Sequence, residues 1–322
     1  MTYNVLGAQA DAVVYDEHAG WAARIDQLQP DVLVVQEAQT DDVTALRALM
    51  RTGYALAAYQ KWACDLKTDR EGVAILVKMT TTVVVGGGGT NVGGSCADPT
   101  MRRVLVWADL EFDGAPLRVY GTHLTAGGGA AAQSRTTQIE LIRARIAADL
   151  PDVGDRWLLA GDMNFVPGSA DYRLILDGTA TAPAPGRMLD TFAELQPAAA
   201  DPGTCPSFAD TPATQAYLLS VPELVRSCGY TAGWAKDTNP LQCDVFSLCT
   251  SWEIRKDTSV RSRIDMVLRP AGGPFDVTRA VNPSRSDADW AWPGAEWFRL
   301  SDHLPYVVDL EPSARLSAAG AG

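Results

Sequence analysis

The sequence predicts a mixed α/β fold, and three observations support this prediction. Short apolar runs typical of buried strands alternate with segments of helical periodicity along the chain. Hydrophobic residues make up 47% of the 322 residues and charged residues 20%, which supports a sizeable core and excludes global disorder. Polar residues of catalytic type follow several apolar runs, and side chains at strand ends converge on one edge of a sheet.

The expected elements follow from the local pattern, taken in order. The expected helices are 21–28, 41–50 and 133–150. The expected strands are 32–35, 72–77, 104–110, 117–122, 157–160, 264–268 and 305–310. The glycine runs 86–89 and 127–129 are expected to form flexible loops, and neither has the spacing of a phosphate-binding loop.

Residues 1–312 are expected to form a single domain, followed by a frayed tail at 313–322. From about 179 to 259 periodicity fades and Pro, Ala, Thr and Cys become frequent, so we expect a Cys-rich insertion there. Four of the six cysteines lie in this stretch, and the even count favours disulfides and an oxidising compartment over reduced thiols. The pattern lacks C-x-x-C pairs and nearby histidines, which argues against a structural zinc site, and it leaves all fifteen complete pairings open.

The first residues read as the end of a strand that is already under way, and no signal peptide precedes them. We therefore expect a secreted protein whose leader and first strand residues have been removed, with a cytoplasmic protein as the alternative. No apolar run approaches the ~20 residues that cross a bilayer. The formal charge of −12 argues against a general nucleic-acid coat protein but is compatible with a local basic groove.

The three histidines of the chain differ in their surroundings. His123 and His303 follow apolar strands inside compact polar signatures, which favours a functional role for both. His18 lies in a polar stretch, and we expect it to be structural.

Carboxylates and amides at strand ends predict a metal-assisted chemistry. Glu37 ends a buried apolar run, where a free carboxylate is costly unless it is paired or bound to a metal ion. Hard oxygen ligands of this kind suit Mg²⁺, with Mn²⁺ or Ca²⁺ as alternatives. Asp162 and Asn164 are two residues apart and share a face of an extended chain, so the acid can activate water while the amide holds a phosphate oxygen. A simple turn is the alternative for this pair.

Six short motifs in order resemble the endonuclease/exonuclease/phosphatase superfamily, which includes deoxyribonuclease I, repair nucleases, neutral sphingomyelinases and inositol polyphosphate 5-phosphatases. The motifs are residues 2–5 (TYNV), 30–37 (PDVLVVQE), 121–124 (GTHL), 161–164 (GDMN), 262–265 (SRID) and 301–303 (SDH). The resemblance runs from Thr2 to about Leu310, outside the insertion. It implies a four-layer α/β sandwich (DNase I-like), in which two packed mixed sheets are flanked by helices, and a metal-dependent phosphohydrolase.

The resemblance also implies roles for the residues that match these motifs. Glu37 would be the main metal ligand, with Asn4 beside it, and Asp302 would complete a second metal position. Asp162 would orient or deprotonate the attacking water.

The remaining implied roles concern the phosphate and the protons. Asn164 would hold the phosphate and stabilise its developing charge, and His123 would bind the scissile phosphate or assist the leaving group. His303 would act as general base or phosphate contact, oriented by Asp265.

Two further residues complete the expected site. Glu71 would pair with His123, as a glutamate does in some members of the family, and Arg103 would contact phosphate. A metal ion and two His–carboxylate pairs supply the base, the charge neutralisation and the leaving-group assistance that ester hydrolysis needs. The motifs include no Ser or Cys nucleophile signature, so they do not imply a covalent intermediate.

The sequence favours a phosphodiester hydrolase but leaves the substrate open. A secreted nuclease acting on DNA or RNA is one interpretation. A sphingomyelinase-like phospholipase C acting on a phospholipid headgroup is another, because Trp290, Trp292, Trp297 and Phe298 are suited to transient membrane contact. Packing of the same aromatics on the insertion is the alternative, and it is slightly favoured.

Two alternatives differ in kind. A phosphomonoesterase acting on inositol phosphates or other small phosphate esters shares the motifs, although the residues around 162–167 and 262–265 depart from the inositol phosphatase pattern. A catalytically inactive binding protein on the same scaffold is disfavoured because Glu37, Asp162 and His303 are all present. We expect no obligate protein partner.

Overall fold

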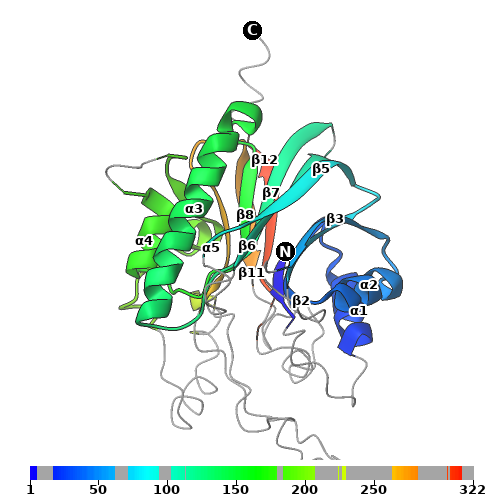
Figure 1. The fold of residues 1–322 in the computed structure, drawn as a ribbon, viewed down its shortest axis with the longest axis horizontal. Coiled ribbons are helices and arrows are strands. Elements are labelled where there is room, and N and C mark those ends of the chain that lie inside the picture. The colour runs from blue at the N-terminus through cyan, green and yellow to red at the C-terminus, as the bar shows by residue number, and fades with distance from the viewer. Residues whose placement is uncertain are drawn as a thin grey trace, which may run out of the picture.

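The computed structural model describes residues 1–5, 17–61, 72–93, 103–112, 114–179, 184–206, 224, 227–229, 263–281, 303 and 305–313. These residues form two large mixed sheets with helices on their outer faces (Figure 1). The predicted four-layer α/β sandwich is confirmed. None of the described helices combines the length and the apolar character needed to span a membrane.

The first sheet has four strands in the order β1-β2-β4-β3. The strands are β1 (Thr2–Asn4), β2 (Val32–Ala38), β3 (Tyr54–Lys61) and β4 (Gly72–Lys78). β1 is parallel to β2, and the other pairs are antiparallel. A bridge between Thr2 and Tyr306 attaches the C-terminal part of the chain to this sheet.

The second sheet has six strands in the order β5-β6-β7-β8-β10-β9. The strands are β5 (Thr82–Asn91), β6 (Val104–Phe112), β7 (Ala115–His123), β8 (Trp157–Asp162), β9 (Met188–Asp190) and β10 (Asp265–Pro270). Only the β7–β8 pair is parallel. β11 (Phe275–Val281) and β12 (Val307–Pro312) form a separate antiparallel pair.

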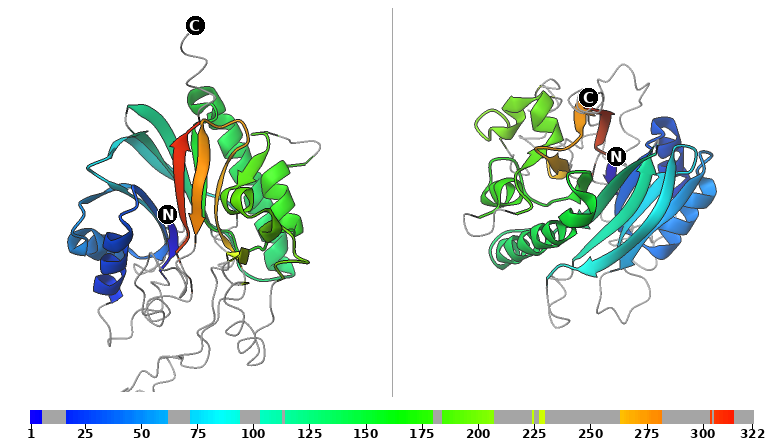
Figure 2. Two further views of the ribbon diagram at one scale, coloured as in Figure 1. Left: turned by 180° about the vertical axis from the view of Figure 1, so that it is seen from behind. Right: turned by 90° about the horizontal axis from the view of Figure 1, so that it is seen from above.

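Helices cover the outer faces of both sheets, as the two further views show (Figure 2). The helices are α1 (Glu17–Leu28), α2 (Thr40–Leu49), α3 (Ala130–Val153), α4 (Ala170–Asp177), α5 (Thr191–Leu195) and the 3₁₀ helix η3 (Pro197–Ala200). One core unites α1 and α2 with the first sheet and with the facing strands of the second. A second core lies between α3, α4 and the other face of the six-stranded sheet. Ile139, Ile142 and Ile146 are buried there, as the predicted helical spacing requires.

The glycine run at 86–89 was predicted to be a loop, and this prediction is wrong. It forms the middle of β5, which is paired with β6 throughout. A Cβ atom on Gly87 would lie 2.6 Å from the carbonyl oxygen of Ala57, because β3 crosses directly over β5. The glycines therefore allow a close approach of two strands, which composition alone does not distinguish from flexibility.

The sequence patterns also missed β3, β5, β11 and α4, and they placed the ends of α3 three residues too far inward. Within the expected insertion, β9 joins the six-stranded sheet as an edge strand beside β10. Cys205 and Cys228 form a disulfide there. The other four cysteines lie outside the described residues.

Candidate active site

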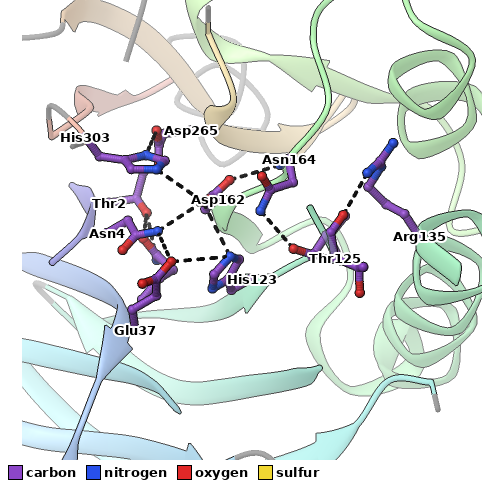
Figure 3. Close-up of polar contacts among 12 residues, drawn as sticks. Thr2, Asn4, Glu37, His123, Thr125, Arg135, Asp162, Asn164, Asp265 and His303 are labelled. Atoms are coloured by element: carbon purple, nitrogen blue, oxygen red, sulfur yellow. Dashed lines mark hydrogen bonds and ion pairs between the residues drawn. The ribbon is translucent and has the colours of Figure 1, made fainter. Parts of the chain in front are cut away.

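Five strands bring predicted site residues together at one edge of the two sheets: β1, β2, β7 and β8 contribute residues at their C-terminal ends, and β10 contributes its first residue. Parallel pairing aligns Asn4 of β1 with the residue before Glu37 in β2. In the second sheet, His123 of β7 is aligned with Asp162 of β8, and Asp162 is aligned with Asp265 of β10. These registers place side chains from distant parts of the sequence within contact of one another (Figure 3).

Glu37 reaches the site through a β-bulge. The register between β2 and β4 shifts between Gln36 and Ala38, so that Glu37 is the extra residue. Its φ angle is 58°, a left-handed conformation that is strained for a glutamate by ~1–3 kcal/mol. Because of the bulge, the Glu37 side chain does not follow the alternation of side chains between the two faces of the sheet. Its Oε1 atom accepts a hydrogen bond of 2.8 Å from Asn4 Nδ2.

Asp162 lies at the centre of the site and is only 1% exposed. Its Oδ2 atom accepts a hydrogen bond of 3.1 Å from Asn4 Nδ2, and lies 3.5 Å from His123 Nε2 and 3.6 Å from His303 Nε2. Its Oδ1 atom accepts the backbone N–H of Asn164 at 3.0 Å. Burial raises the pKa of Asp162 to about 7, which the positive charge on His303 opposes.

His303 is held by Asp265 in a buried pair. The His303 Nδ1 atom is 2.8 Å from Asp265 Oδ2, and the two side chains are 8% and 0% exposed. The Nδ1–H group of His303 donates this hydrogen bond to the Asp265 carboxylate, which fixes the tautomer and directs Nε2 toward Asp162. His303 can thus exchange a proton at Nε2, the atom that faces the centre of the site.

His123 faces both Glu37 and Asp162. Its Nε2 atom is 3.8 Å from Glu37 Oε1 and 3.5 Å from Asp162 Oδ2. Burial, reinforced by the positive charges of Arg103 and His303, lowers the pKa of His123 well below its ordinary value. The imidazole is therefore neutral at physiological pH.

Asn164 lies at the same edge with a φ angle of 50°, a conformation that asparagine tolerates better than most residues. Its Nδ2 atom donates to the carbonyl oxygen of Leu124, in the loop that follows β7. Arg135 Nη1 donates to the carbonyl oxygen of Thr125 in the same loop, which fixes this side of the site.

The carboxylates fit a divalent cation. Glu37 and Asp162, together with His123, offer ligand atoms within 4.8 Å of one another, and Asp162, Asp265 and His303 form a second such group. The second group is engaged in its own hydrogen bond, whereas the first gathers two carboxylates around one amide. Oxygen donors of this kind suit Mg²⁺ or Ca²⁺. A divalent cation would also offset the repulsion between the Glu37 and Asp162 carboxylates, which burial strengthens.

The structure brings most of the predicted residues together. Asn4, Glu37, His123, Asp162, Asn164, Asp265 and His303 lie in one cluster. Arg103, directly before β6, lies close enough to influence the pKa of His123. Glu71 and Asp302, both predicted for the site, lie outside the described residues, as do Trp290, Trp292, Trp297 and Phe298.

Sequence reasoning missed a buried network behind the site. Asp190 forms an ion pair with Arg263, two residues before Asp265, with a nitrogen–oxygen distance of 2.7 Å. The only signal in the sequence was an arginine in the SRID motif, and nothing marked Asp190 as its partner.

The chain thus combines a four-layer α/β sandwich with buried carboxylate and histidine side chains at one sheet edge. The sequence model of the Endonuclease/Exonuclease/phosphatase family matches residues 1–303, and the chain therefore belongs to that family. Members of this superfamily act on phosphate esters as phosphodiesterases or phosphatases. No curated protein matches the sequence significantly.

Solved structures agree on the fold. The catalytic domain of human Nocturnin with a bound sulfate anion is 15% identical, with a TM-score of 0.61, covering 97% of this chain and 92% of that one. D. rerio TDP2 complexed with a single-strand DNA product is 15% identical, with a TM-score of 0.57, covering 96% and 97%. The mannosyl-6-phosphatase Bt3783 of Bacteroides thetaiotaomicron VPI-5482 is 15% identical, with a TM-score of 0.55, covering 92% and 90%. At these identities the likeness shows the fold alone.

Proposed function

We propose that this protein is a Mg²⁺-dependent phosphodiester hydrolase that activates water for attack on phosphorus. The observation that carries the proposal is the arrangement around Asp162. One carboxylate oxygen lies 3.5 Å and 3.6 Å from the Nε2 atoms of two histidines, and one of those histidines is held by a second buried carboxylate. Such a cluster supplies several proton-exchanging groups within reach of one phosphate.

Each side chain has a task that its surroundings support. Asp265 keeps the Nδ1 proton on His303, so that His303 Nε2 takes or gives the proton at the centre of the site. Asp162 orients the attacking water through its buried carboxylate, which lies between the two histidines. The neutral His123 contacts the scissile phosphate or the leaving oxygen through Nε2, and Asn164 stabilises the developing charge.

The residues that would hold the metal ion are Glu37 and Asp162, with Asn4 between them and Asp302 as a predicted second position. When bound, Mg²⁺ would neutralise charge on the phosphate. Mn²⁺ and Ca²⁺ are the alternatives. Asn4 donates to both carboxylates and so keeps them converged on one point.

The proposed substrates are phosphate diesters, either DNA or RNA or a phospholipid headgroup. The family includes enzymes for diesters and for monoesters, and the structurally similar TDP2 was solved with a DNA product. A transient membrane contact through Trp290, Trp292, Trp297 and Phe298 remains a proposal for the phospholipid case. The Cys205–Cys228 disulfide supports secretion into an oxidising compartment.

The test is a substrate panel measured with Mg²⁺ and with excess chelator. The panel holds plasmid DNA, single-stranded RNA, sphingomyelin and phosphatidylcholine vesicles, and a small phosphate monoester. Turnover of one diester that chelator abolishes is the expected result. Turnover of the monoester alone would replace the diesterase with a phosphatase, and silence across the panel would favour an inactive binding protein.

The matched control for this assay compares two histidines. His303 is paired with Asp265 at the site, and His18 is paired with Asp42 on the α1–α2 layer, both at 2.8 Å. His303→Ala should lower the turnover seen in the panel by roughly 10²–10⁴, whereas His18→Ala should leave it intact.

A further inference from the structure

Two adjacent residues behind the site, Asp190 and Thr191, contact the chain segments that carry both His303 and Asp265. Asp190 ends β9 and Thr191 begins α5, at the edge of the six-stranded sheet. Both side chains are buried, with 3% and 0% exposure. Neither contacts any of the predicted site residues among the described contacts, so a direct catalytic role does not explain them.

Asp190 holds the start of β10. Its carboxylate accepts hydrogen bonds from Arg263 Nη1 at 2.9 Å, from Tyr172 Oη at 2.9 Å and from the backbone N–H of Phe192 at 3.1 Å. Arg263 Nη2 lies 2.7 Å from the other carboxylate oxygen, and the guanidinium lies over the ring of Phe192. Arg263 is 1% exposed and precedes Asp265 by two residues, so this buried pair fixes the backbone from which Asp265 projects.

Thr191 holds the segment that follows His303. Its hydroxyl donates to the carbonyl oxygen of Val267 in β10 at 2.8 Å, which leaves its oxygen to accept from Tyr306 Oη at 2.7 Å. Tyr306 is fully buried and lies three residues after His303. Its backbone exchanges two hydrogen bonds of 2.9 Å with Thr2.

The contact between His303 and Asp265 depends on the relative placement of two sheets. Asp265 belongs to the six-stranded sheet, while the segment of His303 is bridged through Tyr306 to β1 of the four-stranded sheet. Asp190 and Thr191 therefore contact both of the chain segments whose side chains meet at 2.8 Å. A small displacement of either segment would lengthen that hydrogen bond and release the orientation of the imidazole.

We propose that Asp190 and Thr191 are positioning residues that set the Asp265–His303 contact and thereby the rate of the chemical step. The kinetic part of this proposal rests on the proposed hydrolase function. The competing explanation is that the buried network only stabilises the fold, as buried ion pairs and hydrogen bonds do elsewhere.

A matched pair of tyrosine variants separates the two explanations. Tyr306→Phe removes the hydroxyl that donates to Thr191, and Tyr120→Phe removes a hydroxyl that donates to Asp149 at 2.8 Å, away from the site. Both tyrosines are fully buried, so both variants should lose similar stability. Only Tyr306→Phe should lower kcat, with KM and the Mg²⁺ requirement unchanged.

Asp190→Asn tests the stronger link. It removes the charge that pairs with Arg263 and should lower kcat roughly 10- to 100-fold, the range typical of groups that orient ligating or catalytic side chains. Equal loss of stability with wild-type kcat in both Asp190→Asn and Tyr306→Phe would overturn the proposal. If Asp190→Asn does not fold, Tyr306→Phe alone decides.

Proton NMR of the metal-free protein provides a readout that does not need a substrate. The Nδ1 proton of His303, bonded to Asp265, should give a downfield resonance that is assigned by its loss in His303→Gln. We expect this resonance to shift or broaden in Tyr306→Phe and Asp190→Asn but not in Tyr120→Phe. An unchanged resonance in the first two variants contradicts the proposal, whereas a changed resonance in a protein that hydrolyses no phosphate ester upholds the positioning role and rejects the hydrolase.

Discussion

Ionisation of Asp162 should destabilise the metal-free protein as the pH rises. The difference in unfolding free energy between Asp162→Asn and the wild type should show the size of this effect. The side chain is 1% exposed, and burial raises its pKa from 3.8 to about 7, with a contribution from the charge of Asp265 and against the influence of His303. Between these two pH values the unfolded chain has lost the proton while the folded protein retains it. The folded state therefore binds more protons there, and its stability falls as the pH rises through this window.

The size of the effect follows from the two pKa values. At ~1.4 kcal/mol per pKa unit, the rise from 3.8 to about 7 corresponds to ~4 kcal/mol, of which ~3 kcal/mol falls between about pH 5 and about pH 8. Asp162→Asn removes this titration while keeping the size of the side chain. The free energy of unfolding of the variant, minus that of the wild type, should accordingly be larger at pH 8 than at pH 5 by ~3 kcal/mol.

The assay is urea denaturation in excess chelator across this pH range. Asp149→Asn is the control. Burial by itself would raise the pKa of Asp149, but hydrogen bonds from Arg145 and Tyr120 outweigh burial and lower the pKa. That carboxylate is ionised throughout the range in both states, so its variant should lose stability by the same amount at every pH. A constant gap between Asp162→Asn and the wild type would refute the reasoning about burial at the site.

Three further substitutions test the site and its framework. His303→Ala should lower kcat by roughly 10²–10⁴, while His18→Ala keeps wild-type kcat; steady-state kinetics would refute the assignment if the two variants matched. Glu37→Gln should raise the Mg²⁺ concentration for half-maximal rate by roughly tenfold or more, since ~1.4 kcal/mol of lost attraction has that effect; an unchanged Mg²⁺ titration would remove Glu37 from the metal site. Gly161→Ala should lower the free energy of unfolding by more than ~3 kcal/mol. The φ angle of Gly161 is +154°, and an added Cβ would lie 2.0 Å from the carbonyl oxygen of Thr122. A melting temperature close to that of the wild type would contradict the close pairing of β7 and β8.

The sequence predicted the site best where local pattern and strand ends coincide. His123 and Asp162 each end an apolar run, and the parallel and antiparallel registers then place these strand ends beside each other and beside Asp265. The spacing of Ile139 and its helical neighbours likewise predicted the buried face of α3. These predictions needed only contacts that a strand or helix period already implies.

Features that depend on contacts between distant segments were not predictable from local pattern. The glycines at 86–89 form part of a strand because β3 crosses over them. The sequence alone does not distinguish such a strand from a loop, since a run of glycines is compatible with both. Asp190 and Arg263 are 73 residues apart, and neither charge is unusual until the fold buries both. The bulge that turns Glu37 into the site arises from its pairing with β4, not from its neighbours in sequence.

The central claim is that water attacks phosphorus at the Asp162 cluster in the presence of a divalent metal ion. The most direct measurement is turnover of the best ester of the panel in water enriched in heavy oxygen, with Mg²⁺ and with excess chelator, followed by mass spectrometry of the products. The account predicts one heavy oxygen on the phosphate-bearing product and no turnover in chelator. Heavy oxygen on the leaving alcohol, or undiminished turnover in chelator, would contradict it.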